Sequence, residues 1–117
     1  MQKKASVRIS GVYSLIRPED GLVERSQTPM IISVWTDMFL HKYLVRIDDP
    51  DQPIQGIYQS IRNDPRFTPE QIHYYSIDQN QFLNPALSAS ENMIGIHEQI
   101  LMVTPSDLKE YGLHPSF

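Results

Sequence analysis

The sequence predicts an α+β domain: an antiparallel sheet of about four to five strands with one or two helices packed on one face. Three observations carry this prediction. Polar and apolar residues alternate near the N-terminus, β-branched and aromatic runs recur along the chain, and later stretches carry helix-capping signals. The expected order is β-β-β-α-β-β-α. With 117 residues, 40% of them hydrophobic, residues 1–117 are expected to form a single domain.

The first strand is expected over residues 4–16. Apolar residues and Gly11 occupy alternate positions there, and Lys4, Arg8 and serines occupy most of the others. The length of the run and the central Gly11 favour a bulge or bend at that glycine. Such a strand leaves an edge with which a second copy of the chain would pair. Residues 18–29 follow as a loop that begins with a Pro-Glu-Asp-Gly turn sequence.

Two further strands are expected before the first helix. Residues 30–36 form a nearly continuous apolar run with β-branched residues, which is typical of a strand buried on both faces. Residues 39–47 fit two patterns: alternation favours a strand, whereas helical spacing of apolar residues, with Asp37 as a cap, favours a helix. We choose the strand because residues 43–47 are rich in β-formers and the run stops at Asp48-Asp49-Pro50.

The first helix is expected over residues 52–62. Asp51 stands at its start, where a carboxylate suits a helix N-terminus, and Asn63-Asp64-Pro65 ends it. Gly56 inside the helix costs about 1 kcal/mol relative to alanine, so a close packing contact is expected there. The apolar stripe of this helix consists of Ile54, Ile57, Tyr58 and Ile61.

A capping-box sequence, Thr68-Pro69-Glu70-Gln71, is followed by a β-branched and aromatic run. One helical turn and then a strand over residues 72–77 are therefore expected. Residues 78–89 are polar and irregular. For residues 89–98 a helix and a strand remain alternatives, and the strand is favoured from residue 94 onward, most firmly over residues 99–103.

The last element is expected to be a short helix. Thr104 is placed to cap it, Pro105 takes the first helical position, and Gly112 is placed to end it in the left-handed conformation.

The composition excludes several kinds of chemistry. Cysteine is absent, which excludes a disulfide scaffold, a cysteine zinc site and a thiol nucleophile. The five glycines lie too far apart for a phosphate-binding or dinucleotide-binding loop. The acidic cluster of Asp48, Asp49 and Asp51 does not fit the spacing of an EF-hand, and no two histidines have the helical i, i+4 spacing of a metal pair. We therefore predict no metal and no cofactor.

Charge is distributed unevenly along the chain. Residues 1–67 hold nine lysines and arginines against eight acids, whereas residues 68–117 hold one lysine against six acids. Nucleic-acid-binding domains usually carry a dominant basic patch, so nucleic acid is not the expected partner. The alternative would use a basic sheet face formed by Lys4, Arg8, Lys42 and Arg46, which lacks aromatic residues at the matching positions.

Five residues are candidates for binding. Trp35, Tyr74 and Tyr75 combine large apolar area with a polar group, as residues at interfaces do. Adjacent tyrosines in a strand point to opposite faces, so at most one of the pair belongs to the core. His41 and His73 lie where they could line an apolar cavity and act as general acids or bases.

The function predicted from these features is a small, non-catalytic binding domain. Its partner would be a protein, either another protein or a second copy of the chain in a homodimer. The first alternative is a small-molecule pocket, with or without cofactor-free catalysis, between the sheet and the helix at residues 52–62, with a histidine in its wall. The second is weak nucleic-acid binding. No apolar run approaches a membrane span and no secretory signal follows Met1, so a cytoplasmic protein without a membrane partner is expected.

Overall fold

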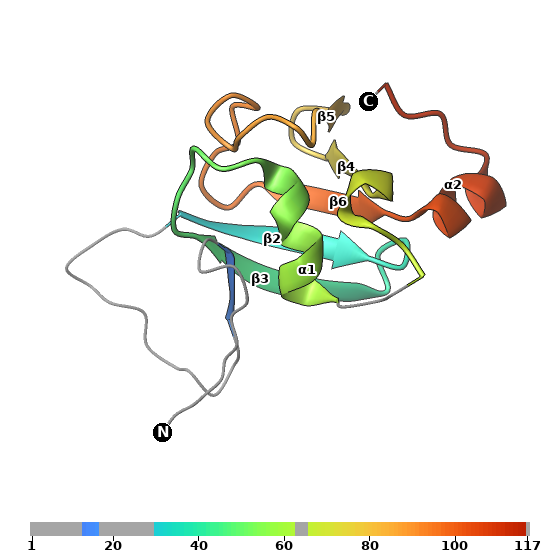
Figure 1. The fold of residues 1–117 in the computed structure, drawn as a ribbon, viewed down its shortest axis with the longest axis horizontal. Helices are drawn as coiled ribbons and strands as arrows, with labels where there is room; N and C mark the ends of the chain where they lie inside the picture. Colours follow the sequence, from blue (N-terminus) through green and yellow to red (C-terminus); the bar gives the residue numbers. More distant parts are fainter. Residues whose placement is uncertain (1–12, 17–29, 63–65, 117) are drawn as a thin grey trace.

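The computed structural model describes residues 13–16, 30–62 and 66–116. Within these residues, six strands form one sheet in the order β1-β3-β2-β6-β4-β5, and α1 crosses one face of it (Figure 1). The strands are β1 (Tyr13–Ile16), β2 (Met30–Thr36), β3 (His41–Ile47), β4 (His73–Ser76), β5 (Gln81–Leu83) and β6 (Gln99–Val103). The helices are α1 (Ile57–Ile61) and α2 (Pro105–Tyr111), with 3₁₀ turns at Ile54–Gly56 and Pro69–Gln71. The predicted α+β class is confirmed.

Among the described residues, strand pairing is antiparallel except at one place. The β2–β3 hairpin pairs over seven residues, β1 joins the outer edge of β3, and β4 lies between β5 and β6. The β2–β6 pair is parallel. A parallel pair needs a long crossover connection, and here α1, β4 and β5 lie between the two strands in the sequence. The strand chosen for residues 39–47 is confirmed over residues 41–47 as β3, whereas Phe39 and Leu40 lie in the turn before it.

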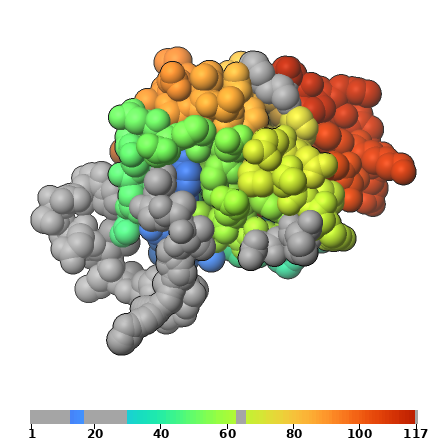
Figure 2. Space-filling model, viewed as in Figure 1, coloured from blue at the N-terminus to red at the C-terminus, as the bar shows by residue number. Residues whose placement is uncertain are grey.

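The core lies between the sheet and α1, as Figure 1 shows. Figure 2, in the same view, shows the residues of α1 and of the segment after it covering the sheet. The stripe expected for this helix does pack inward, since Ile54, Ile57 and Tyr58 are buried and Ile61 is partly buried against them. From the sheet the core receives Ile32, Val34, Val45, Ile47, Tyr74, Leu83, Ile100 and Met102.

Gly56 lies against β1, which explains why a glycine is placed inside a helical segment. A Cβ added there would lie 3.1 Å from Cε2 of Tyr13. The Tyr13 hydroxyl reaches past this point and donates to the carbonyl oxygens of Pro53, at 2.8 Å, and Gln52, at 3.1 Å. The close packing contact expected at Gly56 is therefore a contact with the β1 tyrosine.

The two capping sequences act as predicted. Thr68 and Gln71 form the capping box of the 3₁₀ turn that precedes β4. Thr104 accepts a hydrogen bond from the backbone N–H of Asp107 at the start of α2, and Gly112 ends α2 with a φ of 64°. These boundaries depend on side chains within one helical turn, so local sequence determines them.

Residues 94–98, which were predicted as strand, lie outside the strands, with a turn at residues 96–97. The physical reason is Glu98, a buried carboxylate that accepts a hydrogen bond from the backbone N–H of Gly95 at 2.7 Å. Residues 78–89, expected to be irregular, contain the three-residue strand β5. Of the first predicted strand, residues 13–16 are confirmed as β1. Residues 4–12 and the predicted loop at 18–29 lie outside the described residues.

Candidate functional site

The face of the sheet opposite α1 carries a row of large side chains that crosses five strands. Strand pairing places Lys42 beside Trp35, Trp35 beside Leu101, Leu101 beside Tyr75, and Tyr75 beside Phe82. Their neighbours within each strand are directed into the core on the α1 side, so these five point the other way. We call Lys42, Trp35, Leu101, Tyr75 and Phe82 the aromatic row, and this side of the sheet the open face.

The side chains of the aromatic row contact one another and their neighbours. Lys42 Nζ lies 5.5 Å from the centre of the Trp35 ring, within range of a cation–π interaction. The rings of Tyr75 and Phe82 meet edge to face with centres 5.1 Å apart, a favourable aromatic geometry. Leu101, between Trp35 and Tyr75, is only 5% exposed. The row is thus a packed surface layer on a second face of the sheet.

The polar groups of the two larger rings are already engaged within the domain. Trp35 Nε1 donates to Gln99 Oε1 at 2.7 Å, and the Tyr75 hydroxyl donates to Asn80 Oδ1. These hydrogen bonds restrict the side-chain torsions of both residues. A surface with fixed aromatic rings loses little conformational entropy when something binds to it.

The turn from β2 to β3 presents additional apolar surface beside the row. Three consecutive residues, Asp37, Met38 and Phe39, have φ values of 52°, 52° and 74°. This left-handed conformation is unfavourable for residues with side chains. The turn places Phe39, 46% exposed, with its ring centre 5.7 Å from that of Trp35, and leaves Leu40 78% exposed.

An ion pair holds this turn to the end of α1. Arg62 Nη2 lies 2.9 Å from Asp37 Oδ2. Partial burial acts to raise the pKa of Asp37, but the hydrogen bond and charge of Arg62, together with Thr36 and His41, outweigh it and leave the pKa below its usual value. Asp37 is therefore a charged anchor for the strained turn.

Three of the five predicted binding residues lie together on the open face: Trp35, His73 and Tyr75. His73 packs edge-on to Phe82, with ring centres 6.5 Å apart, and its buried Nδ1 has no hydrogen-bond partner among the described residues. The other two lie elsewhere. The side chain of His41 is 60% exposed, with Nε2 3.8 Å from Asp37 Oδ2, so it does not line a cavity.

Tyr74 requires a correction, because it is wholly buried in the core. Its hydroxyl donates to the carbonyl oxygen of Gln55 and accepts from the backbone N–H of Tyr58, both at 3.2 Å. Burial raises the pKa of this phenol far above its usual value. Tyr74 joins β4 to the segment of α1, so it does not contribute to a surface that a partner could reach.

Sequence reasoning missed the other members of the open face. Phe82 lies in the three-residue strand β5, inside a segment that the sequence marks as polar and irregular. Leu101 lies in β6, where the adjacent residues in the sequence are also apolar, so no alternation marks it as facing the other side. The prediction that the basic sheet face has no aromatic residues beside its lysines and arginines is also wrong for Lys42, because its cross-strand partner is Trp35. The register between strands, which the sequence does not show, brings them together.

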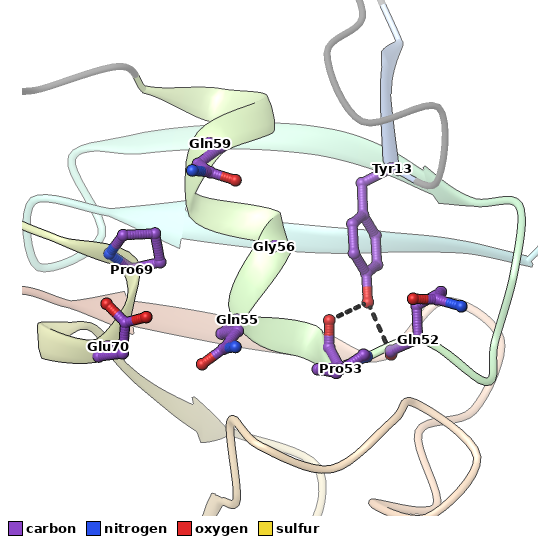
Figure 3. A pocket seen from close by; sticks show the side chains of 8 residues that line it. All are labelled: Tyr13, Gln52, Pro53, Gln55, Gly56, Gln59, Pro69 and Glu70. Carbon is purple, nitrogen blue, oxygen red and sulfur yellow. Dashed lines mark hydrogen bonds between the residues drawn. The ribbon is translucent and has the colours of Figure 1, made fainter.

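A separate hollow lies beside α1, with a volume of about 320 Å³ (Figure 3). Its lining mixes polar and apolar surface and comprises Tyr13, Gln52, Pro53, Gln55, Gly56, Gln59, Pro69 and Glu70. Neither His41 nor His73 is in its wall, so it differs from the apolar pocket considered in the sequence analysis. Within the described residues, no three histidine, aspartate or glutamate side chains are grouped to hold a metal ion. No helix in that part of the chain is long and apolar enough to cross a membrane.

Comparison with known proteins identifies the fold. The chain matches no protein-family model and no curated protein. It is similar to the solution structure of a ubiquitin-like domain of an Arabidopsis thaliana protein, with a TM-score of 0.51 and 11% sequence identity, over 69% of this chain and 82% of that one. It is also similar to a designed protein based on ubiquitin, with a TM-score of 0.52 and 19% identity, over 67% of this chain and 90% of that one. The chain thus has a ubiquitin-like α+β fold.

Proposed function

We propose that this chain is a protein-interaction domain and that the open face of its sheet is the binding surface. The observation that carries the proposal is the aromatic row, with Phe39 and His73 beside it, on the side of the sheet that the core does not use. A core on the α1 side needs none of these aromatic side chains. Interface centres are enriched in aromatic residues because such residues bury much area at little entropic cost.

The chemistry of the open face favours a protein over a nucleic acid. Of the two cations among the described residues of this face, Arg46 is already paired, with Nε 2.7 Å from Asp48 Oδ1. Lys42 lies over Trp35. A nucleic-acid backbone gains affinity from several phosphate contacts, and the described part of this face offers one lysine without a carboxylate partner. Exposed apolar side chains, including Leu44 at 41% and Phe39 at 46%, instead fit an apolar protein surface.

A capture experiment with matched variants tests this proposal. The face variant combines Phe39→Ala and Phe82→Ala, and the control combines Gln59→Ala and Glu70→Ala at the hollow beside α1. Losing two interface aromatics costs about 2–4 kcal/mol of binding free energy, so a partner captured by the unmodified chain is expected to bind the face variant at least about thirtyfold more weakly. The control is expected to retain it. Retention by the face variant with loss by the control would contradict the proposal and point to the hollow.

A further inference from the structure

We infer that the hollow beside α1 is a second binding site, and that its ligand is a guanidinium group on an apolar stem, the side chain of an arginine in another protein or peptide. This inference is independent of the proposed function. The hollow lies on the α1 side of the sheet, whereas the aromatic row lies on the opposite side. Both surfaces can therefore be occupied at once.

The hollow lies over the outward side of the helical segment that contains α1. Gln55, Gly56 and Gln59 line it, and the buried stripe of the same segment faces the sheet. Figure 3 shows Tyr13 on one side of this segment and Glu70 on the other. Because Gly56 has no side chain, its backbone lines the hollow directly and a ligand can lie across the helix there. The volume of about 320 Å³ is at the small end for ligand pockets, so it suits a single side chain.

The polar side chains of the hollow are mostly uncommitted. Within the described residues, the side chains of Gln55, Gln59 and Glu70 make no hydrogen bond and no ion pair, whereas Gln52 Nε2 reaches Asp49 Oδ2 at 3.4 Å. The uncommitted groups offer two amide oxygens and a carboxylate, all of which accept hydrogen bonds. They match a ligand that donates several hydrogen bonds from one end.

Charge around the hollow selects a cation. Among the described residues that line it, Glu70 is the one with a charge. A second carboxylate lies near the wall, because the charge of Asp49 adds to burial in raising the pKa of Tyr13. An anionic ligand would meet these carboxylates with no lysine or arginine in the described lining to offset them. A cationic ligand is attracted by both.

The acceptors favour a guanidinium over an ammonium group. A guanidinium carries five N–H donors in one plane and pairs with a carboxylate through two parallel hydrogen bonds. It can bind Glu70 in this way and still donate to the amide oxygen of Gln55 or Gln59. An ammonium group has three donors and is more strongly hydrated, so it loses more water on entering the hollow. The methylene stem of an arginine then lies over Gly56, beside the ring edge of Tyr13, whose hydroxyl is already bonded to backbone carbonyls.

NMR titration of the isotopically labelled full chain with N-acetyl-arginine amide tests the site. N-acetyl-citrulline amide is the matched ligand, because citrulline has nearly the shape of arginine without its charge. A dissociation constant of about 1 mM is expected for the arginine ligand, as for a ligand of this size. The citrulline and lysine ligands are expected to bind at least about fivefold and threefold more weakly. The backbone N–H of Gly56 and the side-chain amides of Gln55 and Gln59 are expected to shift, and the indole N–H of Trp35 is expected to stay fixed.

Three variants test which side chains hold the ligand. Glu70→Gln removes the charge at nearly constant size and is expected to bring the arginine constant within about twofold of the citrulline constant. Glu110→Gln makes the same change on the exposed surface of α2 and is expected to leave the preference for arginine intact. Gln59→Ala is expected to weaken the arginine ligand about threefold. All three positions are exposed, and circular dichroism verifies that each variant folds.

Each contrary result overturns a definite part of the inference. No shift at the hollow with about 50 mM arginine ligand overturns the site, as do shifts that are equally large at the carboxylates of α2. Equal affinity for the arginine and citrulline ligands overturns the selection of a cation, and equal affinity for the lysine ligand overturns the guanidinium. A preference for arginine that survives Glu70→Gln overturns the role of that carboxylate. None of these results changes the outcome of the capture experiment, so the proposed function stands or fails separately.

Discussion

Replacing Glu98 by alanine is expected to destabilise the domain strongly, because this carboxylate organises the turns before β6 from within. Glu98 is 6% exposed. Its oxygens accept hydrogen bonds from the Ser76 hydroxyl at 2.6 Å, the Gln79 side-chain amide at 2.7 Å and the Gly95 backbone N–H at 2.7 Å. Hydrogen bonds to a charged group each contribute about 1.5–3 kcal/mol.

The net effect is smaller than the sum of the three bonds. The Gln79 amide also donates to backbone oxygens of Asn92 and Met93, so it keeps partners after the substitution. Counting the two remaining bonds, and subtracting the desolvation that the alanine variant no longer pays, gives a loss of about 2–4 kcal/mol in the free energy of unfolding. Glu98→Gln is expected to recover only part of this, because an amide presents a single acceptor oxygen.

Urea denaturation at neutral pH, followed by circular dichroism, measures this loss. Glu110→Ala on the exposed surface of α2 is the matched control and is expected to change the free energy by less than about 0.5 kcal/mol. A Glu98→Ala variant within 1 kcal/mol of the unmodified chain, with an unchanged denaturant slope, would refute the role assigned to this carboxylate.

Three further substitutions test the packing and the anchored turn. Tyr74→Phe removes the hydrogen bonds to the Gln55 carbonyl and the Tyr58 N–H and should lower the free energy of unfolding by about 1–3 kcal/mol in urea denaturation. Tyr75→Phe on the open face should cost under about 1 kcal/mol, and equal losses would be contrary. Gly56→Ala should lower the melting temperature despite the better helix propensity of alanine, because the added Cβ meets the β1 tyrosine at 3.1 Å; a higher melting temperature would show that the ring yields freely. The pKa of Asp37 is lower in the folded chain than in the unfolded chain. The ion pair of Asp37 with Arg62 should therefore stabilise the domain above about pH 4, and this stabilisation should disappear as the pH falls through the lower pKa of the folded state. Arg62→Gln should flatten this acid dependence, and an unchanged acid profile would remove the pair as an anchor.

Elements governed by local signals were predictable from the sequence. The two capping boxes and the left-handed Gly112 depend on side chains within one turn, and the structure has them as predicted. The helical stripe ending at Ile61 follows from periodicity alone. The strand predicted from the alternation that begins at Ile94 does not form there. The buried Glu98 side chain instead accepts a hydrogen bond from the backbone N–H of Gly95 that, in a strand, a neighbouring strand would accept.

The candidate site could be predicted only in part, because it depends on register between distant strands. The sequence indicates that Tyr74 and Tyr75 face opposite sides, but α1 determines which side becomes the core. Phe82 is held in β5 by pairing with β4, and Leu101 meets Trp35 through the one parallel pair of the sheet. Neither contact has a local signal, so the aromatic row becomes visible only when the chain is folded.

Amide NMR spectra recorded during titration with a captured protein partner test most directly whether the open face is the binding surface. Signals of Lys42, Trp35, Tyr75 and Phe82 are expected to shift together as the partner is added, and the indole N–H of Trp35, the chain's only tryptophan, provides a single resolved reporter. Signals of Gln59 and the rest of α1 are expected to stay fixed. Shifts confined to α1 and its hollow, with the open face unchanged, would contradict the assignment.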